Sequence, residues 1–165
     1  DVEARSADEA SLFSSIRLYF NEIVEEVIDS KALLSVGVNQ LGHLDFRAEL
    51  LDDAGNATSA DRGHSYKKLL CIAFDLAVLR AHLDEQFPRF AYHDGVFESL
   101  DDRKKENLLA VIRRYTALGI QSIITLIDSD LPQRTTAEPV FTPDEIVLKL
   151  HDEGERGRLF KMKTW

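Results

Sequence analysis

Cysteine is almost absent from this chain of 165 residues, since Cys71 is the only one. A single cysteine excludes a disulfide within the chain and a zinc site built from several cysteines. Cys71 lies within the apolar run 69–73, so we expect a buried thiol in the reducing cytoplasm.

Long hydrophobic runs are also missing, because no stretch approaches the roughly 18 apolar residues of a membrane-spanning helix. Basic residues are outnumbered, with 20 Lys and Arg against 29 Asp and Glu, which gives a net charge of −9. This acidity disfavours broad, non-specific binding of nucleic acid. A local basic patch is still compatible with the net charge. The 44% of apolar and 30% of charged residues are typical of a soluble globular chain, and the length suits one domain or a large lobe of one.

Methionine occurs once, at Met162, and the chain begins with Asp1. No basic segment followed by an apolar one opens it, as a secretory signal would. We therefore expect an excised piece of a longer protein, in which an active site need not be complete.

Residues 1–30 are expected to form a helix. Ser6 and Glu9 have the spacing of a capping box, which predicts that the helix begins at Ser6. Apolar side chains then recur at alternating spacings of three and four, at Phe13, Ile16, Phe20, Ile23 and Val27. This pattern fits the seam of a coiled coil or the inner face of a helix lying on its own domain, and two heptads are too few to decide.

The pattern then changes to strands. In residues 32–50, apolar and polar side chains alternate in two runs around Gly42. This pattern predicts an antiparallel hairpin with one solvent-exposed face. A polar loop over 52–65 follows. It leads into residues 66–86, which are apolar nearly all round and predict a helix buried on most faces.

The second half of the chain predicts an α/β fold. A short apolar strand over 88–94, a helix over 102–117 and a strand over 120–127 follow one another with short links. This order is typical of parallel strands with flanking helices. Residues 146–150 and 159–162, separated by glycines, predict a closing hairpin.

Acidic side chains follow both strands of this unit. Asp94 ends the first strand, with Glu98 and Asp101 nearby, and Asp128 and Asp130 follow the second. Ligands of open α/β sheets lie beyond the carboxyl ends of the strands, where a carboxylate can hold Mg²⁺ directly or through water. The alternative is that these are solvated loop acids or helix caps, and it is stronger for Asp101, which opens a helix.

The run 90–112, FAYHDGVFESLDDRKKENLLAVI, resembles the Walker B strand, D-loop and following helix of ABC-type ATPases of the SMC, Rad50 and RecF group. Asp94 matches the Walker B aspartate, and Ser99, Leu100 and Asp101 match the D-loop. Upstream, SADRGHSYKKLLCIAFDLAVL resembles the signature loop and its helix. Downstream, GIQSIITLIDSD occupies the place of the strand that ends in the switch histidine.

The resemblance covers about residues 10–163 and is closest to SMC-like proteins with a DUF2326-type C-terminal domain. It implies the C-terminal half of a P-loop ATPase head, with 1–30 as a coiled-coil exit helix and 31–165 as the ATPase lobe. An N-terminal lobe would carry the P-loop, and a second head would complete a homodimer around ATP and Mg²⁺. The resemblance further implies that the complete assembly binds DNA and that it acts in DNA repair or phage defence.

The resemblance also implies roles for single residues. Asp94 would hold Mg²⁺ through water. Ser59 or Ser65, together with Gly63, would approach the γ-phosphate of a nucleotide bound by the opposite protomer, and Asp101 would contact the dimer partner.

Three departures from the family pattern bear on activity. Gly95 stands where the family usually places the acidic residue that activates water, and Glu98 could substitute only if the loop folds back. The switch position, 125–128, has no histidine. No GxxxxGK[ST] occurs, so the backbone cradle for phosphates is absent and we expect no ATP hydrolysis by this chain alone.

Other functions remain open at this point. A Toprim-like nuclease would use Glu98 with Asp128 and Asp130 to bind two metal ions, although its Glu should follow the strand directly. A phosphohydrolase using His93 and Asp94 would need that pair on a helix. A degenerate head that only scaffolds would explain Gly95 and the missing switch histidine.

Overall fold

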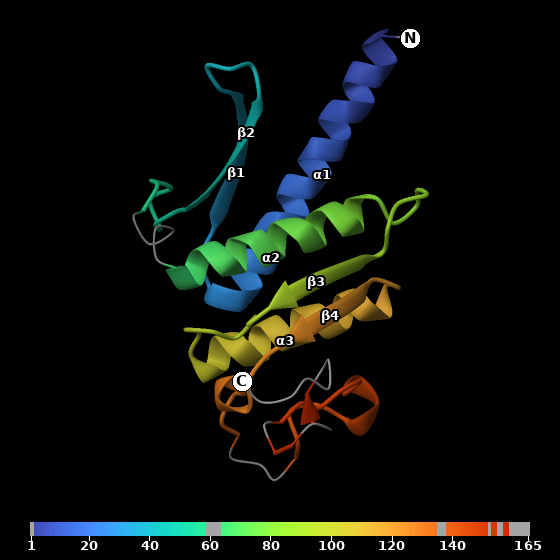
Figure 1. The fold of residues 1–165 in the computed structure, drawn as a ribbon. Coiled ribbons are helices and arrows are strands. Elements are labelled where there is room, and N and C mark those ends of the chain that lie inside the picture. Colours follow the sequence, from blue (N-terminus) through green and yellow to red (C-terminus); the bar gives the residue numbers. More distant parts are fainter. Residues whose placement is uncertain (1, 59–63, 135–137, 152, 155–156, 159–165) are drawn as a thin grey trace. The chain divides into compact units, whose positions relative to one another are not determined.

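The computed structural model describes residues 2–58, 64–134, 138–151, 153–154 and 157–158. The chain forms two compact units, Asp1–Pro132 and Gln133–Trp165. In the described part of the first unit, the elements are α1 (Val2–Ile28), β1 (Ala32–Val38), β2 (Leu44–Leu50), α2 (His64–Ala81), β3 (Phe90–Asp94), α3 (Asp102–Ala117), β4 (Gln121–Thr125) and the 3-10 helix η2 (Asp128–Asp130) (Figure 1). No helix in these ranges combines the length and apolar character needed to cross a membrane.

Helix α1 begins at Val2, so Ser6 lies inside the helix and the predicted start is wrong. The later part of its apolar seam is fully buried, at Phe20, Ile23 and Val27. These side chains are buried because α1 packs against α2, α3 and β1. The last turns of the helix therefore lie on their own domain, as the second of the two alternatives predicts.

Strands β1 and β2 form the predicted antiparallel hairpin, with Ala32 opposite Leu50 and Val38 opposite Leu44. One face of the hairpin is apolar along its whole length, since side chains alternate between the faces of a strand. Near the helices this face is buried, at Ala32, Leu34 and Leu50. Its outer half, the hairpin tip face, consists of exposed side chains: Val36, Val38, Leu44 and Phe46.

Among its described side chains, helix α2 is buried or half-buried on most faces, as predicted, and only Lys67, Cys71 and Asp75 are exposed. Its inner stripe is buried, at Leu69, Leu70, Ile72, Ala73, Leu76, Ala77 and Leu79. Cys71 and Asp75 are one turn apart on the opposite face, and both residues are exposed. The prediction of a buried thiol is therefore wrong, because Cys71 falls on the narrow stripe of α2 that the rest of the unit leaves uncovered.

Strands β3 and β4 pair in parallel, with Phe90 opposite Gln121 and Asp94 opposite Thr125. They lie side by side in Figure 1, with α2 packed on β3 and α3 on β4. Helix α3 connects the two strands, so the predicted strand, helix and strand are confirmed. The amphipathic pattern of α3 is regular, and its buried side chains are Leu108, Leu109, Val111, Ile112 and Tyr115.

The second unit contains the 3-10 helix η3 (Pro143–Glu145). Thr142 and Glu145 form a capping box there, and the N–H of Ile146 donates back to the Pro143 carbonyl. Residues 146–150 are not a strand, so this half of the predicted closing hairpin is wrong. The turn at Pro143 leads into a segment with exposed apolar side chains, such as Val147, and no ladder partner in the described residues. Residues 159–162 lie outside the described residues.

Candidate functional site

Asp94 stands at the carboxyl end of β3, beside the end of β4. The Thr125 hydroxyl donates a hydrogen bond to Oδ1 of Asp94. The backbone N–H of Gly95 donates to the Thr125 carbonyl at 2.8 Å, which continues the pairing one residue past the strand. The Tyr92 hydroxyl lies 3.5 Å from Oγ1 of Thr125. The neighbouring strand thus fixes the orientation of an exposed carboxylate.

His93 points to the other face of the sheet, as strand alternation requires. Its Nε2 lies 3.0 Å from a carboxylate oxygen of Asp75 on α2, and its side chain is only 11% exposed. His93 and Asp94 therefore do not act on one ligand from one side. The phosphohydrolase alternative is wrong because the pair lies on a strand.

The loop after Asp94 folds back over its own start. Gly95 has a positive φ of 59°, which glycine adopts without steric cost. Val96, Phe97 and Leu100 anchor the loop in the core. The N–H of Glu98 donates to the Gly95 carbonyl at 3.1 Å, and a Cβ on Gly95 would collide with the Glu98 carboxylate. This is the loop geometry that a substitution of Glu98 for the missing acidic residue requires.

Lys68 on α2 holds the same loop and was missed by the sequence analysis. Its Nζ donates to Oε2 of Glu98 at 2.6 Å and to the carbonyl of Gly95 at 3.2 Å. A signal was present in the sequence, since Lys68 precedes the apolar Ile72 by one helical turn and so borders the inner face of α2. Its position opposite Glu98 could not be read from that spacing.

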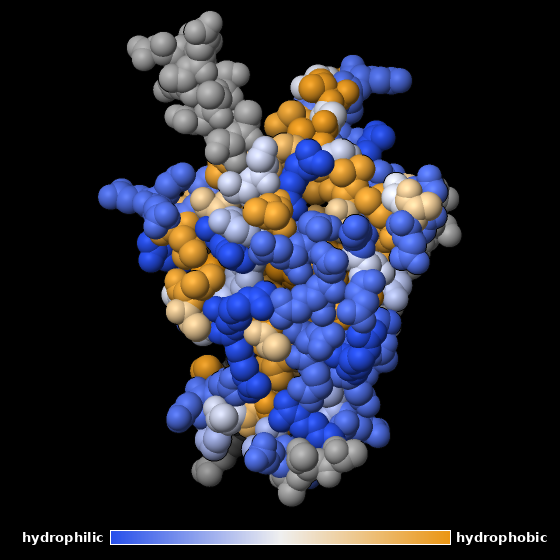
Figure 2. Space-filling model, turned by 180° about the vertical axis from the view of Figure 1, so that it is seen from behind, coloured by the Kyte–Doolittle hydropathy of each residue, from blue (hydrophilic) through white to orange (hydrophobic). Residues whose placement is uncertain are grey.

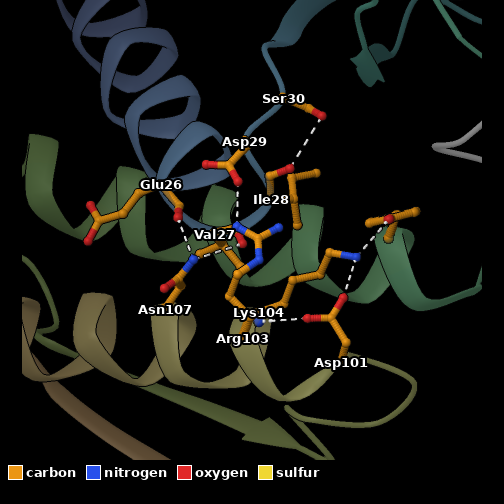
Figure 3. A network of polar contacts seen from close by, with 10 residues as sticks. Glu26, Val27, Ile28, Asp29, Ser30, Asp101, Arg103, Lys104 and Asn107 are labelled. Atoms are coloured by element: carbon orange, nitrogen blue, oxygen red, sulfur yellow. Dashed lines mark hydrogen bonds and ion pairs between the residues drawn. The ribbon is translucent and has the colours of Figure 1, made fainter.

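Asp101 caps α3, as the simpler of its two interpretations predicts. Its carboxylate accepts the N–H of Lys104 at 3.0 Å, and the Lys104 ammonium lies 2.7 Å away (Figure 3). These hydrogen bonds from Lys104 lower the pKa of Asp101, and the carboxylate in turn raises the pKa of Lys104. Lys104 also donates to the Tyr66 hydroxyl at 3.3 Å, which links the start of α3 to the start of α2.

The same turns of α3 hold the end of α1 (Figure 3). Nδ2 of Asn107 donates to the carbonyls of Glu26 and Val27 at 3.1 and 3.4 Å. Arg103 forms an ion pair with Asp29, which has a positive φ of 54° just after α1. Side chains of α3 therefore satisfy carbonyls that the helix end leaves without intrahelical partners.

The signature residues are only partly covered by the structure. Ser59 and Gly63 lie outside the described residues. Ser65 lies in the first turn of α2, where only the backbone is described. Their predicted role near a nucleotide stays a prediction.

The acidic residues of the site offer few ligands for a metal ion. Among the described residues, no three His, Cys, Asp or Glu side chains come together as a metal-holding group. The Toprim alternative needs carboxylates from both loops to converge, and Glu98, Asp128 and Asp130 form no such group. Asp94 does suit one kind of Mg²⁺ site, in which water and phosphate oxygens supply most of the ligands. Such a site needs a single exposed carboxylate from the protein, and Asp94 is exposed.

A family model described as an uncharacterised protein conserved in bacteria (DUF2326) matches residues 22–164. No curated protein matches the sequence.

Solved structures of SMC proteins match the fold. One, described as structural biochemistry of ATP-driven dimerization and DNA stimulated activation of SMC ATPases, is 21% identical with a TM-score of 0.51 over 72% of this chain and 71% of that chain. The Smc head domain of Pyrococcus furiosus, with an extended coiled coil and bound to the C-terminal domain of ScpA, is 21% identical with a TM-score of 0.52 over 72% of this chain. A Smc head bound to the C-winged helix domain of ScpA is 23% identical with a TM-score of 0.51 over the same 72%. The matches span only 30% and 36% of these last two chains. The fold is therefore a mixed α/β fold similar to SMC head domains.

Proposed function

We propose that this chain, which belongs to the DUF2326 family and is related to SMC ATPase heads, forms the C-terminal lobe of an SMC-like ATPase head. In this proposal, residues 1–30 are a coiled-coil exit helix. Residues 31–165 are the lobe that carries the signature, Walker B and D-loop elements. The P-loop comes from an N-terminal lobe, because this sequence contains no GxxxxGK[ST].

The observation that carries the proposal is the incomplete sheet that ends in Asp94. In the described residues, β3 and β4 form a sheet of two strands. Parallel sheets are normally covered on both faces, and two strands alone are marginal. Here one face of the sheet leaves Phe90, Tyr92 and Ile123 exposed. A second lobe that adds strands and covers this face would explain both features.

The surface of the chain supports a covering lobe as well. The hairpin tip face is a further apolar area that continues from a buried base. In the view from behind, apolar residues also reach the surface in several separate areas among polar ones (Figure 2). Exposed apolar faces that continue from a core are typical of surfaces that contact another protein segment.

Asp94 holds the water shell of Mg²⁺ in this proposal, with its carboxylate oriented by Thr125. The Mg²⁺ ion supplies neutralisation of charge on the β- and γ-phosphate oxygens of ATP. Ser59 or Ser65, together with Gly63, approaches the nucleotide of the opposite head. Asp101, exposed at the start of α3, contacts that head.

Glu98 is the general base in this proposal. It accepts a proton from water while the water oxygen forms a bond to the γ-phosphorus. The bond from that phosphorus to the bridging oxygen breaks, ADP leaves with the electron pair, and the proton passes from Glu98 to the released phosphate. The fold-back of the loop over Gly95 supports this role, because it brings Glu98 to the position after Asp94 that lacks an acidic side chain.

The test is ATP hydrolysis by the full-length protein with Asp94→Asn. This substitution keeps the shape and removes the charge, so turnover should fall at least about a hundredfold. Asp84→Asn, in the exposed turn after α2, is the matched control and should leave turnover unchanged. Unchanged turnover in Asp94→Asn would refute the Walker B assignment. Micromolar binding of Mg-ATP by the 165-residue chain alone would mean instead that the phosphate cradle lies within this chain and not in an N-terminal lobe.

A non-catalytic scaffold is the second candidate. It is favoured by Gly95 at the usual acidic position and by the ion pair that engages Glu98. A scaffold head would dimerise on ATP without turnover. Light scattering of the full-length protein with and without ATP, beside a phosphate-release assay, separates it from an ATPase.

Partners and pathway follow from the same proposal by analogy. Two heads form a homodimer around nucleotide in the cytoplasm, and the complete assembly contacts DNA. DNA repair and defence against phage are the processes that such an assembly would serve.

A further inference from the structure

Glu98 is a side chain with three rotatable bonds, and nearly half of it is exposed. A base must be held within a narrow range of positions, because misplacement of a reacting group costs rate steeply. In the described parts of the chain, the hydrogen bond to its carboxylate comes from Lys68. The position of Glu98 thus depends on a residue from α2.

Lys68 is itself well placed to fix Glu98. Its side chain is 28% exposed, so the ammonium is partly shielded from water. It donates at once to the Glu98 carboxylate and to the Gly95 carbonyl, at 2.6 and 3.2 Å. One acceptor, the Gly95 carbonyl, lies at the start of a short turn, and the other, the Glu98 carboxylate, lies at its end. The two hydrogen bonds fix the position of the Lys68 ammonium, and the ammonium in turn holds the two ends of the turn together.

Gly95 makes room for this arrangement. A Cβ at this position would collide with the Glu98 carboxylate and lie 3.0 Å from Nζ of Lys68. The space that a side chain at position 95 would need is therefore filled by the Lys68–Glu98 ion pair. The ion pair in this position therefore requires glycine at position 95.

We propose that Lys68 is a positioning residue that holds Glu98 over Gly95, in place of the acidic side chain that position 95 lacks. The inference rests on the proposed function and adds a residue from the helix that follows the signature loop. It makes the geometry of the base depend on α2, so a shift of α2 against β3 moves Glu98 as well.

The test uses the full-length protein with Lys68→Met, which keeps the length of the side chain and removes its charge. We expect kcat for ATP hydrolysis to fall about tenfold, the scale for loss of an orienting partner, with KM for ATP changed less than twofold. Lys68→Arg should recover most of the lost rate. Lys67→Met, on the neighbouring exposed position of α2, should change neither constant by more than twofold.

Two further measurements separate positioning from a general structural effect. In the Glu98→Gln background, Lys68→Met should have no additional effect on kcat, since the side chain that it positions is already disabled. In the nucleotide-free protein, Lys68→Met should speed hydrogen exchange of the amides of Glu98 and Leu100, whose hydrogen bonds close the turn. Lys67→Met should leave that exchange unchanged.

An unchanged or raised kcat in Lys68→Met would overturn the inference, as would an equal loss in the Glu98→Gln background. A full-length protein that dimerises on ATP without turnover would overturn it too. Failure of the proposed function is seen separately, because the full-length protein then has no turnover at all or keeps its turnover unchanged in Asp94→Asn. If Asp94→Asn abolishes turnover and Lys68→Met does not change it, only the role of Lys68 is refuted.

Discussion

Thr125 donates a hydrogen bond to Asp94 across two paired parallel strands, and the two residues are direct partners in the register. In the family that the sequence resembles, this end of the second strand carries a histidine. Here a hydroxyl at the last residue of β4 contacts the proposed Walker B carboxylate. The contact couples the ends of the two strands at the candidate site.

Replacing the hydroxyl tests this contact. Thr125→Val keeps the shape and removes the donor, so Asp94 loses its orienting partner. In the full-length protein, turnover should fall about tenfold and the Mg²⁺ concentration for half-maximal rate should rise. Thr125→Ser keeps the hydroxyl and should stay close to the wild-type rate. Equal rates for Val and Ser at this position would mean that the contact does not orient the site.

The junction between α1 and α3 gives a prediction about stability. Asn107→Ala removes two hydrogen bonds to carbonyls at the end of α1 and should lower the free energy of unfolding by about 1–3 kcal/mol. Arg103→Ala breaks an ion pair whose side chains are 57% and 69% exposed, so the loss should stay below about 1 kcal/mol. Urea unfolding of both variants measures the difference. Equal losses would show that the contacts of Asn107 do not hold the junction.

Cys71 tests the orientation of α2. Because it is the only cysteine and is exposed, one maleimide per chain should react rapidly in the folded protein without denaturant. Mass spectrometry counts the adducts. A thiol that reacts only after addition of urea would mean that α2 turns this face inward, as the apolar run 69–73 predicts.

The cap of α3 gives a prediction about pH. The Lys104 hydrogen bonds lower the pKa of Asp101 from its ordinary value of 3.8, so the folded state favours the ionised form. This contribution to stability is present at neutral pH, and it is lost as the pH falls below 3.8 through the lowered pKa. An NMR titration of the Asp101 carboxyl carbon should have its midpoint below 3.8.

Two variants check the cause of that shift. Lys104→Met should move the Asp101 midpoint back toward the ordinary value, because the side-chain hydrogen bond is its largest cause. Lys105→Met is the matched control on the next residue and should leave the midpoint in place. A midpoint that does not move in Lys104→Met would contradict the assigned cause.

Local patterns determined most of the elements. The alternation in 32–50 predicted the hairpin, and the strand, helix and strand around Asp94 were predicted nearly to the residue. Periodicity and turn residues are properties of neighbouring positions, so one sequence is enough to reveal them. Asp101 is a further example, since a helix cap depends on the residues within one turn.

Tertiary structure decided which side of each element is covered and which distant groups meet. Cys71 lies in an apolar run, yet it falls on the one narrow stripe of α2 that packing leaves exposed among the described side chains. Lys68 and Glu98 are 30 positions apart, and they meet because α2, β3 and the turn at Gly95 are packed together. The sequence by itself determined the elements, because hydrophobic period and turn chemistry act between near neighbours. Only packing decided the candidate site, because burial and ion pairing act between side chains that the chain order leaves far apart.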